Sequence, residues 1–435
     1  MDVRDSADEE LRAALRSLEE SVPDTEGVPR VKVGGEILRP AVLFGTAILA
    51  IILVVTAQGW LPAPVGQGTP SPGISSGTPS AVGSPSPDAS PISPPELAWV
   101  TQSFPGGSIA AAAGAETGWV ALGDVEAWFS PDGTTWQEGS IEGVDVAPWD
   151  PALTLGPPHP IAVARVGETW YALSRLEFVA HDVSPVVFTS SDGHTWTYLP
   201  SSAWWGQNPT ALASDGKLLI ATNVGPLGGQ GSVFVSANGI DWAEHVAPGG
   251  PASMVDVYAG PGDRIVAVGY RASDEELEIP VVWVSDDGSS WTEAQPIDAE
   301  RATTPRAVER TVTGAFVMLT TVTTFPADCA ENACLIHTLG AWYSADGYKW
   351  QKAQFPAASA PFGTYREIDL LPISGGLLAV TSTREGSSAW VTADGVTWKA
   401  AEFTDLTLAI SAGASNGDSV LLFGTSGEVV AGKAP

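Results

Sequence analysis

Short apolar segments, separated by turns rich in glycine and aspartate, recur from residue 97 to the C-terminus. Residues 108–141 show the unit clearly. Apolar residues occupy 109–113, 119–122 and 127–129, and a fourth segment ends beyond Trp136. Segments this short, joined by tight turns, are typical of strands in an antiparallel meander. The pattern therefore predicts an all-β fold built from four-stranded meanders.

One phrase, Ser/Thr-x-Asp/Asn-Gly-x-x-Trp, marks the turn before the fourth strand of each unit. It occupies residues 130–136, 190–196, 236–242, 285–291, 344–350 and 392–398. Successive copies lie 46 to 60 residues apart, which is typical of a solenoid, a propeller or an array. A small meander cannot bury both of its faces alone, whereas copies stacked around a closed ring can do so. We therefore expect a β-propeller.

The acidic or amide residue of each copy is expected to have a structural role. An Asp or Asn side chain accepts hydrogen bonds from backbone N–H groups further along such a turn, and Gly supplies the positive φ. A residue that recurs in six copies is more consistent with a structural role in the fold than with a role in one active site. The residues concerned are Asp132, Asp192, Asn238, Asp287, Asp346 and Asp394.

The two ends of the repeat region predict the number of blades. After Trp398 three more apolar segments follow, at 406–411, 419–423 and 427–431. At the other end, Trp99 and Phe104 have the spacing seen after the repeat tryptophans. Residues 97–104 are thus expected to supply the last blade's fourth strand. This predicts a seven-bladed propeller over residues 97–435, closed by its N-terminal strand.

These phrases resemble the Asp-box, or bacterial neuraminidase repeat, of sialidase-like β-propellers, in a shortened form that lacks the residue between Asp and Gly. The resemblance covers residues 97–435. It implies a propeller, but no particular activity, because sialidases, other glycosidases, sorting receptors and assembly factors carry related boxes.

Residues 41–61 form an uncharged apolar segment long enough to cross a bilayer as a helix. Arg30, Lys32 and Arg39 precede it, and no Lys or Arg follows until Arg165, so the N-terminus is expected in the cytoplasm. A cleaved signal peptide is the alternative, although the 40 residues before the segment are long for one.

The segments on either side of this span have different characters. Residues 1–40 form the cytoplasmic tail, in which 6–22 fit a short amphipathic helix that could bind a cytoplasmic partner. Residues 62–96 are rich in Pro, Ser and Gly and predict an extended linker. The propeller is therefore expected outside the cell membrane.

Composition limits the choice of partners. The formal net charge of −30 makes a nucleic acid an unlikely ligand, because an acidic surface repels phosphates. Cys329 and Cys334 have no Cys/His cluster around them, so a local disulfide is favoured over a zinc site. The sequence predicts no cofactor and no metal.

Long loops are expected on one face of the propeller, which we call the long-loop face. They follow the second and fourth strands, whereas the Asp-Gly turns lie on the opposite face, which we call the turn face. Loops on a rigid scaffold are common binding sites. The residues predicted to bind a ligand there are Trp149, Trp204, Trp205, Arg271, Phe325, Phe362 and Arg366.

Three functions remain open at this point. The first is a non-catalytic binding module that recognises a cell-wall glycan or a surface protein, although the aromatic residues could instead pack the loops onto the disc. The second is a sialidase-like glycoside hydrolase. The family's Phe/Tyr-Arg-Ile-Pro segment is missing, and Arg271, Arg301, Arg306 and Arg366 form no recognisable triad. The third is a sensor that signals through the cytoplasmic helix.

Overall fold

The computed structural model describes residues 31–33, 36–38, 94–143, 156–178, 183–200, 208–225, 231–272, 278–299, 302–324, 335–356, 358–361, 365, 367–383, 386–401 and 408–433. They belong to two compact units, one ending at Ser86 and one beginning at Pro87. None of the helices in the described ranges is long and apolar enough to cross a membrane. The predicted span, the tail helix, nearly all of the linker and both cysteines lie outside these ranges.

In the first unit, two short strands pair antiparallel. They are β1 (Val31–Val33) and β2 (Glu36–Leu38).

The described part of the second unit is all-β, and its strands follow one another as antiparallel meanders. The first three are β4 (Ala111–Ala115), β5 (Gly118–Leu122), β6 (Ala127–Ser130), β7 (Gln137–Glu138); β9 (His159–Val166), β10 (Thr169–Glu177), β11 (Val183–Ser190), β12 (Thr195–Leu199); and β13 (Asn208–Ser214), β14 (Leu219–Val224), β15 (Ser232–Ser236), β16 (Ala243–Val246).

The remaining meanders have the same order. They are β17 (Ser253–Tyr258), β18 (Ile265–Ala272), β19 (Glu278–Ser285), β20 (Thr292–Glu293); β21 (Thr303–Arg310), β22 (Phe316–Thr324), β23 (Ile336–Ser344), β24 (Gln351–Lys352); β26 (Glu367–Ile373), β27 (Gly376–Ser382), β28 (Ser387–Thr392), β29 (Lys399–Ala400); and β30 (Ile410–Ser415), β31 (Ser419–Gly424), β32 (Glu428–Lys433), which pair with β3 (Ala98–Ser103). Two strands add to these, β8 (Ser140–Glu142) beside β12 and β25 (Ser359–Pro361) beside β23.

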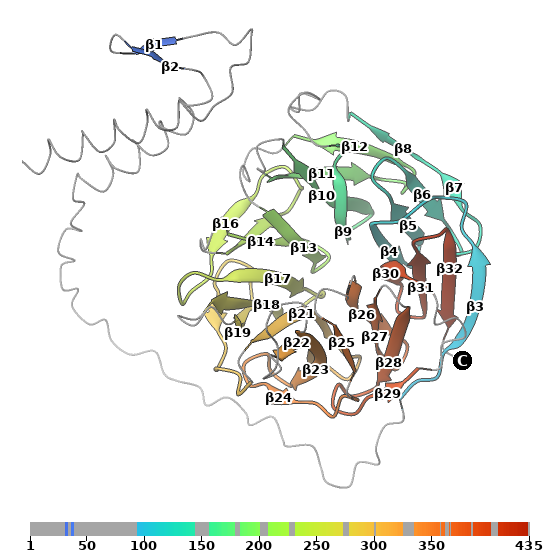
Figure 1. Ribbon diagram of the computed structural model, residues 1–435. Coiled ribbons are helices and arrows are strands. Elements are labelled where there is room, and N and C mark those ends of the chain that lie inside the picture. The colour runs from blue at the N-terminus through green and yellow to red at the C-terminus, as the bar shows by residue number, and fades with distance from the viewer. Residues whose placement is uncertain are drawn as a thin grey trace, which may run out of the picture. The chain divides into compact units, whose positions relative to one another are not determined.

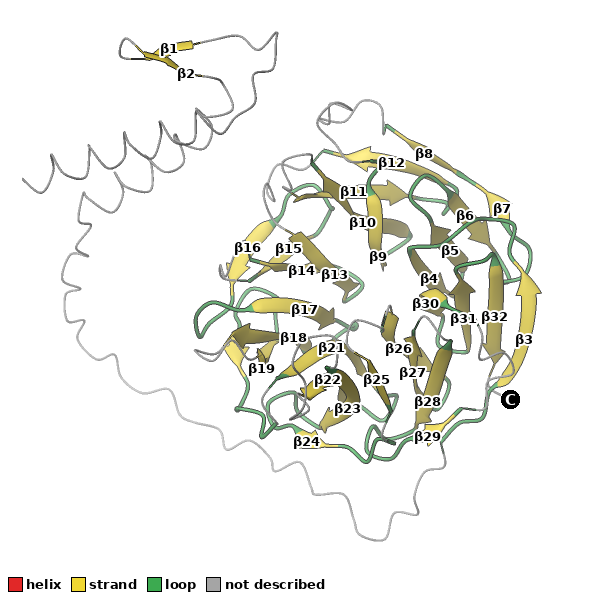
Figure 2. Ribbon diagram, in the orientation of Figure 1, coloured by secondary structure: helices red, strands yellow, loops and turns green. Residues whose placement is uncertain are grey.

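The meanders follow one another around a central axis, with the first strand of each innermost and the last at the rim (Figure 1). Figure 2 shows the sheets arranged around this axis, with loops joining the strands within each sheet and from one sheet to the next. The arrangement is propeller-like. The strand predicted at 97–104 is present as β3, which pairs antiparallel with β32 from Ala98↔Lys433 to Ser103↔Glu428.

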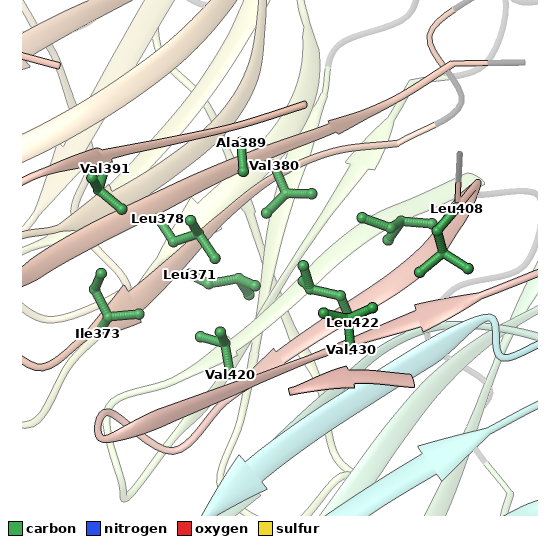
Figure 3. Close-up of a cluster of buried hydrophobic side chains, with 11 residues drawn as sticks. Leu371, Ile373, Leu378, Val380, Ala389, Val391, Leu408, Val420, Leu422 and Val430 are labelled. Atoms are coloured by element: carbon green, nitrogen blue, oxygen red, sulfur yellow. The ribbon is translucent and has the colours of Figure 1, made fainter. Parts of the chain in front are cut away.

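The apolar core lies between neighbouring meanders. In the cluster of Figure 3, Leu378 and Val391 come from the β26–β29 meander, and Val420 and Leu422 come from the next one. All four are almost completely buried. Burying one such side chain is worth about 1.5 to 3 kcal/mol, so the stacking of meanders supplies the main driving force for the fold.

The six Asp-Gly turns share one hydrogen-bonding pattern. In the second copy, the Gly193 N–H donates to Ser190 Oγ (2.9 Å), and the His194 and Thr195 N–H groups donate to Asp192 Oδ1 (both 2.8 Å). The turn glycines have φ between +73° and +78°. Hydrogen bonds to the carboxylate hold the pKa of Asp132, Asp192, Asp287 and Asp346 below its usual value.

At the rim, a hydrogen bond to one of these turns joins a meander to its neighbour, and it occurs in several pairs of meanders. The Ser140 N–H donates to the His194 carbonyl, and the Gln354 N–H donates to the Val396 carbonyl in the equivalent place. The Gln102 side chain reaches the Gly133 carbonyl in the same way (2.7 Å). The turns therefore contribute both to their own hairpins and to the contact between one meander and the next.

Candidate functional site

The innermost strands enclose a cavity of about 770 Å³ on the axis of the disc. They are β4, β9, β13, β17, β21, β26 and β30. Apart from one pair of β17 with β14, at Ser253 and Val224, each has a free edge that faces the axis, so no further sheet fills the centre. A volume of this size lies within the range of about 300 to 1,000 Å³ that is typical of small-ligand sites.

The wall of this cavity has two different halves. Strands β30, β4, β9 and β13 contribute mainly small residues, such as Ala111–Ala113 and Ala412–Ala414. Apart from Arg165 on β9, the charged groups come from strands β17, β21 and β26. These are Asp256, Arg306, Glu309, Arg310 and Asp369, accompanied by Tyr258. The small residues leave room for the cavity, and the charged half supplies groups that can form hydrogen bonds and ion pairs.

A β-bulge recurs near the start of the inner strands and places one residue out of register. The register of β21 against β22 shifts between Pro305 and Ala307, so Arg306 is the extra residue. Comparable shifts occur in β13, β17 and β30. A bulge redirects side chains. Here it sets the Arg306 guanidinium in the cavity wall, where its Nε–H donates to Thr321 Oγ1 at 2.9 Å.

Arg306 belongs to a polar group at the long-loop end of the cavity. Its charge acts on Glu278, which accepts a hydrogen bond from Thr304 Oγ1, and on His337. Burial raises the pKa of Glu278, and burial together with the charge of Arg306 lowers the pKa of His337. Burial also lowers the pKa of Arg306 itself. Arg306 thus brings one cation to the cavity wall, and hydroxyl, carboxyl and imidazole groups lie near it in the protein.

Three carboxyl groups line the wall deeper in the cavity. Asp256 Oδ2 accepts the Val308 N–H of the next inner strand, at 2.8 Å. Glu309 Oε1 accepts the Arg310 N–H, and Asp369 Oδ1 accepts the Leu370 N–H, both also at 2.8 Å. Each side chain keeps some accessible surface, and protein surrounds them, so this surface is the contact with the cavity.

Burial dominates the acid–base properties of these carboxyl groups. It raises the pKa of Asp256 to about 6, that of Asp369 to about 7 and that of Glu309 to about 8. The negative charge of Asp256 adds to the rise for Asp369, and the charges of Asp256 and Asp369 add to the rise for Glu309. The backbone N–H bonds act in the opposite direction, because they favour the ionised form.

At the other end of the cavity, next to the turn face, the arginine side chains are bound by other groups of the protein. Arg310 forms an ion pair with Asp263, and the Tyr258 hydroxyl donates to Asp263 Oδ2 at 2.9 Å. Arg165 donates to Thr117 Oγ1 at 2.8 Å and lies over the Trp170 ring. These arginines are already engaged by the protein, which leaves Arg306 as the better candidate for binding a ligand.

Of the residues predicted to bind a ligand, Arg271 lies in the described part of the chain. Its Nη1 and Nη2 donate to Glu293 Oε1 and Oε2, at 2.9 and 2.8 Å, and Nη2 also donates to the Pro248 carbonyl. It further lies over the Trp283 ring. The contacts with Glu293 and Trp283 are within one meander, and Pro248 lies in the loop that leads into it. The other predicted residues, Trp149, Trp204, Trp205, Phe325, Phe362 and Arg366, lie outside the described residues.

Sequence reasoning missed the charged half of the cavity. A signal for it exists, because the first strand carries an acidic residue in three successive units, at Asp256, Glu309 and Asp369. A metal site is not indicated in the part of the chain that the structure describes, where no group of three or more His, Cys, Asp or Glu side chains is placed to hold an ion.

Comparisons with known proteins add few constraints. No family model matches the chain, and no curated protein does so either. Among solved structures, the chain is similar to a streptogramin B lyase, with a TM-score of 0.49 and 9% identity over 78% of this chain and 98% of that one. It is also similar to a virginiamycin B lyase from Staphylococcus aureus, with a TM-score of 0.49 and 6% identity over 78% and 100% of the two chains. Likenesses this weak carry no argument about activity.

Proposed function

We propose that this chain is a membrane-anchored, extracytoplasmic binding module. Residues 41–61 cross the membrane once, residues 62–96 hold the domain away from it, and residues 97–435 form a seven-bladed propeller of the shortened Asp-box type. The module is non-catalytic. It binds a cell-surface ligand, either a cell-wall glycan or another protein, at its long-loop face.

The central cavity is the observation that carries this proposal. Its volume of about 770 Å³ suits a small polar group, such as one or two sugar units, better than a flat protein surface. Arg306 lines the cavity wall nearer the long-loop face, where it can bind hydroxyl, carboxylate or amide groups. A terminal glycan residue that enters this end of the cavity is therefore the favoured ligand.

The predicted aromatic residues fit the same model. Trp149, Trp204, Trp205, Phe325 and Phe362 belong to the long loops. Aromatic rings stack well on the apolar faces of sugars. In this proposal they hold the part of the glycan that remains outside the cavity.

The proposal is tested with the full-length chain in a mild detergent against a panel of cell-wall glycan fragments. We expect a fragment to bind, and Arg306→Gln to weaken its affinity at least tenfold, because a charged hydrogen bond is lost. Lys217→Gln, on the turn face, is the matched control and should bind normally. Failure of every fragment and of surface proteins to bind would refute the binding role.

The two alternatives make different predictions in the same experiment. A sialidase-like glycoside hydrolase would release a sugar product from a fragment, and loss of Arg306 would then lower the rate of release. A sensor would require a cytoplasmic protein that binds residues 6–22 and responds to the glycan. Arg165 and Arg310, the other arginines of the cavity wall, lie at the turn-face end, which disfavours a three-arginine carboxylate site with Arg306.

A further inference from the structure

We infer that the carboxyl groups of Asp256, Glu309 and Asp369 form a proton-binding switch in the cavity wall, which tightens the packing of β17, β21 and β26 when it is protonated and loosens it when it ionises. This inference concerns the domain itself and does not depend on the identity of the ligand.

The position of the three groups is the first argument. They come from three successive inner strands and lie in one half of the cavity wall. Asp256 connects two of these strands directly, since its Oδ2 accepts the Val308 N–H of β21. Asp369 Oδ2 lies close to the backbone of β30, where a Cβ added at Gly413 would be 3.0 Å from it. A change of charge here therefore acts on the contacts between meanders.

The surroundings supply little compensation for negative charge. Strands β13 and β30, which flank the charged half, carry no titratable side chain. The second strands β22 and β27 carry none either. Strand β18 carries Tyr270 and Arg271, of which Arg271 is paired with Glu293, and β19 carries Glu278. On the inner strands themselves, Arg310 is paired with Asp263, Tyr258 donates to Asp263, and Glu367 begins β26.

Arg306 is the remaining cation of the charged half, and its charge acts on Glu278 and His337 at the long-loop end. In the described residues no ion pair joins Asp256, Glu309 or Asp369 to a cation. Ionisation of all three would therefore leave like charges close together in a wall that protein largely surrounds.

The direction of the pH dependence follows from the raised pKa values. A carboxyl group whose pKa is higher in the folded than in the unfolded state favours folding most below its unfolded pKa, and this contribution is lost as the pH rises through its folded pKa. For these groups the loss falls between about pH 6 and pH 8. The packing of β17, β21 and β26 is thus tighter in mildly acidic conditions and looser above neutrality.

Urea unfolding of the full-length chain between pH 5.5 and 8.5 tests this inference. Each proton that folding binds makes the folding equilibrium constant fall about tenfold per pH unit. His337, whose pKa is lowered, acts in the opposite direction, so the variants are the cleanest measure. Glu309→Gln should raise the folding equilibrium constant at pH 8. It should also make the fall of this constant with pH less steep, by about a factor of ten per pH unit.

Two controls make the result decisive. Glu138→Gln changes an exposed carboxyl group at the rim and should leave the slope unchanged. Asp369→Asn should have the same effect as Glu309→Gln. It serves as the second test in case one of the two variants folds poorly. A Glu309→Gln or Asp369→Asn protein that folds and keeps the wild-type slope would overturn the inference, as would a calorimetric measurement that finds no proton uptake when the wild-type chain refolds at pH 7.

Discussion

The tightness of the contact between meanders can be measured at the turn glycines. Gly193 and Gly288 occupy the same place in the repeated turn and have nearly the same φ, +78° and +75°. Their carbonyl groups accept the same bond, from Trp196 Nε1 and Trp291 Nε1. The two positions differ in the space around the missing Cβ, so alanine at each position separates backbone strain from packing.

The structure gives the expected size of each effect. A Cβ at Gly193 would lie 2.6 Å from Phe129 Cδ2 and 3.0 Å from Val120 Cγ1, in the preceding meander. A Cβ at Gly288 would lie 3.5 Å from its nearest neighbours, Ile265 and Val235, which is ordinary contact. Gly288→Ala should therefore lose about 1 kcal/mol for the positive φ. Gly193→Ala should lose a further 1 to 3 kcal/mol, roughly, for overpacking.

Urea unfolding followed by tryptophan fluorescence is the assay, with the free energies of unfolding compared at one pH. Nearly all of the 17 tryptophans lie in residues 97–435, so their fluorescence reports the unfolding of the domain as a whole. Equal losses at the two positions would refute the reasoning, because the glycines would then serve only the turn conformation. A larger loss at Gly288 would show that the meanders pack differently from this description.

Other substitutions test the hydrogen bonds of the turns and of the rim. Asp192→Ala should lower the free energy of unfolding by about 1 kcal/mol at pH 7, since two backbone N–H groups lose their acceptor, whereas Asp192→Asn should lose less, because Asn238 makes the same bonds in its own turn. Since the pKa of Asp192 is lowered, the stability it contributes is present above its unfolded pKa and lost as the pH falls through its folded pKa, so the wild-type and Asp192→Ala midpoints should converge in acid. Gly139→Ala should lose about 1 to 3 kcal/mol, because its Cβ would overlap the His194 carbonyl, and amide exchange at Ser140 should speed up more than exchange in β5. If Ser140 exchanges at the wild-type rate in Gly139→Ala, the bond at the rim does not depend on that glycine.

Local sequence patterns predicted the features that depend on local chemistry. The Asp-Gly turn is set by hydrogen bonds between residues two or three apart, and the pairing of β3 with β32 follows from the spacing of Trp99 and Phe104. The structure has both. The propeller-like arrangement follows in turn, since meanders with two apolar faces must stack.

The sequence did not predict the cavity, for a different physical reason. Which edge of a strand faces the axis, and how near Asp256, Glu309 and Asp369 come to each other, depend on the arrangement of whole meanders. Seen alone, each is an acidic residue in one strand, with nothing to show that the three lie together. The pairing of Arg271 with Glu293 likewise spans two intervening strand contacts, β18 with β19 and β19 with β20. The role of the predicted loop aromatics stays a prediction.

The position of β3 has a consequence for the order of folding. Its partner β32 is the last strand of the domain, so the pairing of Ala98 with Lys433 joins residues separated by nearly the whole domain. Contacts between such distant residues form slowly, because closing a long loop loses chain entropy before any contact is gained. The other meanders form from neighbouring segments and can assemble as the chain is synthesised. The first strand of the domain to be made must therefore wait for the last one, and an incomplete chain keeps two open edges that could pair with another molecule.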